Sequence, residues 1–134
     1  MIIDHIRDDD EFKTFFKKHP MNDGIFSLDF IMNNPHLYCF YDKLRGFLKG
    51  YINVYRNETG KLFLSGAAKR KILPDIKLAI ITVCDAFDED MYSETDKREA
   101  KIALLKAGFT KLNDNLLVRY KNGKRQQRSG ISDN

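Results

Sequence analysis

Aromatic residues at helical spacing indicate the first helix of the chain. Three of them recur at i, i+3 and i+4, which places them on one helix face: Phe12, Phe15 and Phe16. Asp8 or Asp9 can cap the amino end of this helix, and Pro20 closes it. A strand over residues 1–6 precedes it. Residues 24–33 predict either a second helix or a short strand, because so brief an apolar run fits both.

Beyond residue 36 the apolar positions alternate with a period of two, as in half-buried strands. Turn signals at 42–45 and 57–60 separate three runs that are rich in aromatic and β-branched residues. These runs are 37–42, 46–56 and 62–65. Together they predict an antiparallel meander of three strands.

The second half of the chain returns to helical spacing. Pro74 suits the first turn of a helix. The apolar stripe of this helix consists of Ile76, Ala79, Ile80, Val83 and Phe87. A separate helical turn over 67–72 can precede it, and Met91–Glu94 predicts a short strand.

A last helix and two strands complete the pattern. Asp96 and Glu99 form a start that resembles a capping box. The apolar face of this helix carries Ala100, Ala103, Leu104 and Ala107. Gly108 ends the helix, and Phe109 can fold back on its last turn. The closing strands are 110–112 and 116–120.

The composition is that of one globular domain. With 43% hydrophobic residues, 134 residues can bury a real core, and we expect a single α/β or α+β domain over residues 1–121. The chain has no run of about 18 apolar residues, and Asp4 follows residues 1–3 too soon for a secretory segment, so we expect a cytoplasmic protein without membrane contact. Cys39 and Cys84 lack C-x-x-C spacing, which predicts free thiols.

Residues 122–134 form a basic tail with almost no apolar side chains, and we expect this end to be disordered. Lys124, Arg125 and Arg128 follow Lys121 in a chain whose net charge is +4. Such a tail can touch nucleic acid or an acidic partner. It can equally serve as a solubilising terminus, because it lacks the aromatic residues that would stack on bases.

A run of small residues follows the third strand of the meander. The expected strand ends at Ser65 and passes into Gly66 and two alanines, with three cations behind them: Lys69, Arg70 and Lys71. Backbone N–H groups that side chains do not cover can bind an anion, and the cations favour a phosphate-rich one. The segment therefore predicts a nucleotide-cofactor site. The alternative is an ordinary glycine turn with a solvated basic face.

The order of these elements resembles that of the GNAT N-acetyltransferase superfamily. The best match is MYSETDKREAKIALLKAGF, which closes on Lys106, Ala107, Gly108 and Phe109 and has Ala100 eight positions before the glycine. The resemblance covers residues 1–121. It implies a mixed, mostly antiparallel sheet of six or seven strands with helices on both faces. Within the superfamily, LSGAAKRK followed by a helix looks closest to small GNAT-like proteins of tailed phages, which are associated with head assembly and virion interiors.

The resemblance implies that acetyl-CoA or another acyl-CoA binds between the fourth and fifth strands. The implied cofactor residues are Leu64, Ser65, Gly66, Ala67, Ala68, Lys69, Arg70 and Lys71. Amides of the small residues and Lys69 would hold the pyrophosphate, and an amide near Leu64 or Ser65 would face the thioester. Bulk at Gly66 should then be harmful.

The resemblance also implies catalytic roles in transfer to an unidentified amine. Glu94 would be the base, and Tyr92 or Ser93 the acid. As alternatives, Tyr92 is a half-buried strand aromatic and Glu94 caps the next helix. The chain departs from the family at three positions: Phe63 stands in the pyrophosphate motif, Leu104 replaces a tyrosine that protonates the thiolate, and Lys97 replaces an asparagine.

Two functions therefore remain open. One is an acyl-CoA-dependent N-acyltransferase. The other is a phage head-assembly or internal virion protein, located in the host cytoplasm or the virion, that contacts phage structural proteins and uses a catalytically reduced form of the fold. Acidic residues at 85–90 predict a solvated turn rather than a metal site, because no histidine accompanies them.

Overall fold

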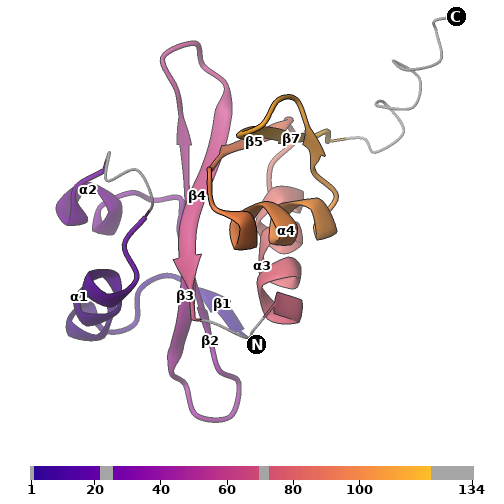
Figure 1. Ribbon diagram of the computed structural model, residues 1–134. Coiled ribbons are helices and arrows are strands. Elements are labelled where there is room, and N and C mark those ends of the chain that lie inside the picture. The colour runs from indigo at the N-terminus through magenta and orange to yellow at the C-terminus, as the bar shows by residue number, and fades with distance from the viewer. Residues whose placement is uncertain (1, 22–25, 70–72, 122–134) are drawn as a thin grey trace, which may run out of the picture.

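The computed structural model describes residues 2–21, 26–69 and 73–121 (Figure 1). The predicted tail over 122–134 lies outside these ranges, as do Arg70 and Lys71 of the predicted cofactor site. In chain order the elements are β1 (Ile2–Asp4), α1 (Asp9–Lys18), α2 (Leu28–Met32), β2 (Leu37–Tyr41), β3 (Leu48–Arg56), β4 (Leu62–Ala68), α3 (Leu73–Asp85), β5 (Met91–Glu94), α4 (Arg98–Lys106), β6 (Thr110–Lys111) and β7 (Leu116–Arg119).

The strands of the described residues form one seven-stranded sheet in the order β1-β2-β3-β4-β5-β7-β6. Neighbouring strands pair antiparallel except β4 and β5, which run parallel. The crossover between these two strands contains α3, as parallel pairing requires a long connection. The predicted fold class is thereby confirmed: a single α+β domain with a mixed, mostly antiparallel sheet.

Helices cover both faces of the sheet, with α1 and α2 on one face and α3 and α4 on the other (Figure 1). Buried side chains of the α1/α2 face include Phe12, Phe15, Ile31, Leu37 and Tyr51. Those of the α3/α4 face include Val54, Leu64, Ala79, Val83, Leu104 and Leu117. In the described part of the chain, no helix combines the length and the apolar character needed to span a membrane.

The first two helices begin at side-chain caps. A carboxylate oxygen of Asp8 accepts the N–H of Glu11 at 3.0 Å, which confirms Asp8 as a cap. The hydroxyl oxygen of Ser27 accepts the N–H of Phe30 at 3.1 Å and caps α2 in the same way. The ambiguous segment over 24–33 therefore contains a helix in its described residues, not a strand.

The last helix ends as predicted and begins differently. Gly108 has a φ of +98°, and the N–H of Phe109 donates to the carbonyl oxygen of Leu104 at 3.0 Å, as at a glycine C-cap. The expected cap at Asp96 is wrong, because the residue at the cap position is Lys97 and its side chain makes no capping bond. At this corner Thr95 Oγ1 accepts the N–H of Lys97 at 3.2 Å.

Candidate functional site

Strands β4 and β5 part after two paired residues and leave a cleft between them. Their pairing joins Leu62 to Met91 and Phe63 to Tyr92 and then stops, although both strands continue. The cleft has a volume of about 680 Å³. It is lined from both faces of the sheet, by apolar side chains of α3 and α4 and by the C-terminal end of α1.

Backbone hydrogen bonds fix which amides of β4 face the cleft. At one end of the β3–β4 ladder the N–H of Asn57 donates to the carbonyl oxygen of Lys61 at 2.9 Å. At the other end the N–H of Lys69 donates to the carbonyl oxygen of Lys49 at 3.0 Å. An antiparallel ladder alternates between bonded and non-bonded pairs. Odd-numbered residues of β4 therefore direct their amides toward β3, and even-numbered residues direct theirs toward β5.

Gly66 and Ala68 are the even-numbered residues of β4 that follow Leu64, so their N–H groups face the cleft. The prediction that the amides of Ala67 and Lys69 join them is wrong, because both belong to the β3 side. The cause is the length of β4, which continues through Ala68 instead of turning after Ser65. For the same reason the helical turn expected to begin at Ala67 does not form in its described residues.

The amide of Leu64 also points to the β5 side, but the parallel Phe63–Tyr92 pair uses it, because the residue after Phe63 donates to the carbonyl oxygen of Tyr92 in such a ladder. The amide of Ser65 points to β3, so neither amide fits the predicted thioester contact. The hydroxyl of Ser65 donates to the sulfur of Met21 at 2.9 Å on the α1/α2 face. The implied cofactor residues from Leu64 to Lys69 all line the cleft. Charged residues from other parts of the chain also line the cleft: Lys18, Glu94, Lys97 and Glu99.

The sheet itself requires glycine at position 66. A Cβ at Gly66 would collide with the carbonyl oxygen of Tyr51 on β3. The strand approaches its neighbour so closely that only a hydrogen atom fits. The expected harm of bulk at this position therefore follows from strand packing, and a substitution there does not test ligand binding. Ala68 is the better position for such a test.

Ser93 occupies the point where the two strands separate. Its side chain is 4% exposed, and its hydroxyl donates to the carbonyl oxygen of Leu64 at 3.0 Å. The hydroxyl thus satisfies a backbone acceptor just beyond the last paired residue of β4. Among the predicted catalytic residues, Ser93 lies within the cleft and its proton is directed at the strand.

Tyr92 lies on the opposite face of β5 from Met91 and Ser93. Its ring stacks on that of Phe63, with centroids 5.5 Å apart, and the ammonium of Lys61 lies 5.0 Å from its centre. Tyr92 is not among the residues that line the cleft. The alternative interpretation, a half-buried strand aromatic, therefore describes it better than a catalytic acid.

Glu94 is exposed and lines the cleft at the end of β5. It does not cap α4, because Lys97 holds the cap position. A carboxylate at this edge can accept a proton directly or through water. Glu94 therefore keeps its predicted role as a candidate base.

No pattern in the sequence indicates that the end of α1 belongs to the site. Lys18, His19 and Pro20 line the cleft, although more than forty residues separate them from β4. The hydroxyl of Tyr51 on β3 holds this end by donating to the carbonyl oxygen of His19 at 2.9 Å. A single histidine followed by proline carries no spacing signal that could have revealed this contact.

Two of the three departures from the pattern of the resembled family lie at the cleft, and the third, Phe63, does not line it. Leu104 is 4% exposed, lines the cleft and packs in the α3/α4 core. Lys97 lines it as well. An apolar side chain at Leu104 provides no proton for a leaving thiolate.

The acidic turn at 85–90 is paired with cations. Asp85 lies 3.1 Å from Arg119, and Asp88 lies 3.4 Å from Lys121. Glu89 pairs with Arg56, and this contact lowers the pKa of Glu89 through a hydrogen bond to the guanidinium. Within the described ranges, no group of three or more histidine, cysteine or acidic side chains could hold a metal ion.

Both cysteines are free and buried. Desolvation raises the pKa of Cys39 and of Cys84 to about 12. Thiols of this kind stay protonated at neutral pH and are poor nucleophiles. The chemistry of the cleft therefore does not involve a cysteine of this chain.

Searches of family models, curated proteins and solved structures returned no match to the chain.

Proposed function

We propose that this chain is a GNAT-like protein that binds acyl-CoA in the cleft between β4 and β5. The observation that carries the proposal is the pair of amides, from Gly66 and Ala68, that face an opening where a neighbouring strand would otherwise lie. The strand order and the parallel β4–β5 pair support it, because they agree with the order of elements on which the family resemblance rests.

The residues of the cleft fit such a ligand. A volume of about 680 Å³ lies in the range usual for small-molecule sites. Fixed N–H donors suit a diphosphate, and Lys69 adds a cation at the same end. Apolar side chains such as Ile76, Ile80 and Ala103 suit an uncharged arm. The ligand would supply an activated acyl thioester.

The chain can contribute a general base to the transfer of an acyl unit to an amine. Glu94 would accept the proton of the amine. The arrangement lacks a well-placed general acid to protonate the leaving thiolate. Tyr92 does not line the cleft and Leu104 is apolar, so among the predicted catalytic residues Ser93 is the one whose hydroxyl lies there.

This weakness favours a second candidate function, a phage head-assembly or internal virion protein that keeps the fold without efficient turnover. Its supporting observation is Leu104, which fills the cleft side of α4 where a catalytic tyrosine is expected. The two candidates agree on the fold and differ on catalysis.

Calorimetry with acetyl-CoA tests the binding step. Ala68→Glu places a carboxylate beside the proposed diphosphate, and Ala86→Glu makes the same change of charge at an exposed position outside the cleft. We expect binding to the wild type and to Ala86→Glu, and binding at least about tenfold weaker to Ala68→Glu because like charges meet. Absence of binding to the wild type, or equal affinity in the two variants, would remove the proposal.

Release of free CoA thiol in the presence of a panel of primary amines tests catalysis. Turnover that falls in Glu94→Gln supports the transferase. Tight binding without turnover for any amine of the panel supports the assembly protein.

A further inference from the structure

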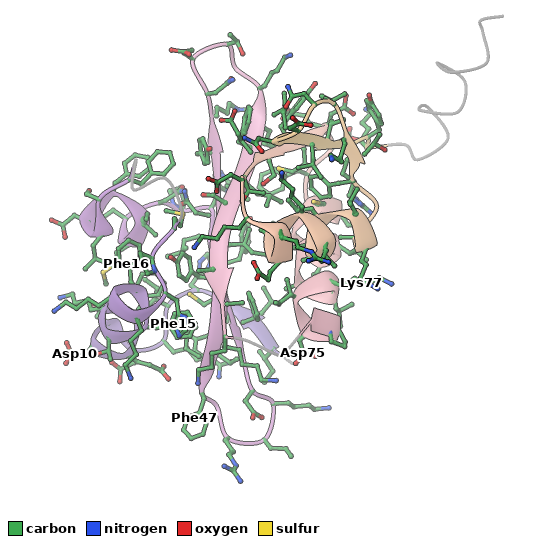
Figure 2. All side chains as sticks on the ribbon, in the orientation of Figure 1. Asp10, Phe15, Phe16, Phe47, Asp75 and Lys77 are labelled. Atoms are coloured by element: carbon green, nitrogen blue, oxygen red, sulfur yellow. The ribbon has the colours of Figure 1, made fainter. Side chains whose placement is uncertain are left out.

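Lys49 lies where three elements meet at one end of the cleft. It belongs to β3, and its carbonyl oxygen accepts the N–H of Lys69, the residue that follows β4. Its ammonium donates to Asp75 in the first turn of α3 at 2.7 Å. Lys69, which makes the first of these contacts, lines the cleft, and so does Ile76, the residue that follows Asp75. Figure 2 shows Asp75 at the lower, N-terminal end of α3.

The ion pair between Lys49 and Asp75 lies at the amino end of α3. The amino end of a helix attracts an anion, and Asp75 supplies one from within the chain. The hydrogen bond to Asp75 raises the pKa of Lys49, so this amine stays protonated at neutral pH. The two side chains are 22% and 36% exposed, so a ligand can reach them.

We propose that Lys49, which lies beside the cleft without lining it, reaches a phosphate bound there and that Asp75 competes with the ligand for it. The proposal rests on the proposed function, since it concerns the phosphate groups of acyl-CoA. A diphosphate held by the amides of Gly66 and Ala68 brings a second anion to the end of the cleft beside Asp75, whose neighbour Ile76 lines it. Lys49 then exchanges its partner, and Asp75 without Lys49 repels the incoming phosphate.

The two members of the pair therefore affect affinity in opposite directions. Lys49→Met removes the cation and should weaken acetyl-CoA binding about tenfold or more, the effect of losing a charge-assisted hydrogen bond. Asp75→Asn removes the competitor and should tighten binding severalfold. A purely structural pair would behave differently, because either substitution would break the same contact and weaken binding in both variants.

Calorimetry with two probes decides the matter. The probes are acetyl-CoA and S-acetyl-pantetheine, which has the same thioester arm and no phosphate. Only acetyl-CoA should respond to the two substitutions. Lys77→Met is the matched control, because Lys77 is an exposed lysine of α3, the helix of Asp75, and it lies on the side of this helix away from the sheet (Figure 2). Its affinity for acetyl-CoA should stay within about twofold of the wild type, as for a screened surface charge.

The outcomes separate this inference from the function on which it rests. If the wild type does not bind acetyl-CoA, both fall. If the wild type binds and Lys49→Met binds equally well, or if Asp75→Asn weakens binding, the role of Lys49 falls and the function stands. Thermal melting shows whether each variant is folded. Should Lys49→Met fail to fold, Asp75→Asn decides alone: tighter binding supports the inference, and equal or weaker binding overturns it.

Discussion

The hydroxyl of Ser93 should stabilise the fold more than its size suggests. It donates to the carbonyl oxygen of Leu64 at 3.0 Å, in surroundings where Ser93 is only 4% exposed. Ser93→Ala leaves this acceptor without its partner at the point where the strands separate. A buried acceptor that loses its donor costs about 1–3 kcal/mol. We therefore expect the free energy of unfolding to fall by about 2 kcal/mol.

Urea unfolding monitored by circular dichroism measures this loss. The midpoint should fall while the slope stays constant, because the surface exposed on unfolding hardly changes. The melting temperature should fall by about 4 °C for each kcal/mol lost. Ser93→Thr should recover most of the loss, since it keeps the hydroxyl and threonine suits a strand.

Ser65→Ala is the matched control for the loss of a serine hydroxyl. The hydroxyl of Ser65 donates to the sulfur of Met21, and thioether sulfur is a weak acceptor. The control should therefore cost less than about 1 kcal/mol. Equal losses in Ser93→Ala and Ser65→Ala, or a loss below about 0.5 kcal/mol in Ser93→Ala, would refute the reasoning, because the buried carbonyl would then not depend on Ser93.

Two further predictions concern other parts of the fold. Gly66→Ala should destabilise the protein by about 2 kcal/mol or more in urea unfolding, because its Cβ collides with the carbonyl oxygen of Tyr51; a variant as stable as the wild type would contradict the close approach of β3 and β4. Arg56→Met should remove an acid-dependent contribution to stability: Arg56 lowers the pKa of Glu89, so the contribution is present above the unfolded pKa of Glu89 and is lost as the pH falls through its folded pKa. Unfolding measured between pH 2 and 7 should show the wild type and the variant converging in acid, and a constant difference would speak against this linkage.

Local spacing predicted most of the elements correctly. The cap at Asp8, the glycine end at Gly108 and the meander over 37–65 depend on residues a few positions apart, and the structure confirms each of them. The errors arose where a local sequence pattern favoured one structure and packing against a distant segment required another. Gly66 resembles a turn glycine, but it lies in β4, at a position where β3 approaches too closely for any side chain.

The candidate site was predicted only in part. The segment from Leu64 to Ala68 does line the cleft, and Glu94 and Ser93 do as well. Tyr92, one of the two residues predicted as the acid, does not line the cleft, and alternation along a four-residue strand does not reveal which face meets it. The position of His19 at the cleft could not be predicted, since it depends on packing between segments far apart in the chain. The same holds for the contact between Lys49 and Asp75.

The sequence by itself determined the helices, the strands and their apolar faces, because these depend on side-chain periods of 3.6 and 2 within a few residues. Only the tertiary structure decided where β4 and β5 separate and which amides the separation leaves open. Those properties depend on the pairing register of strands that a helix connects, and register results from the packing of both sheet faces together.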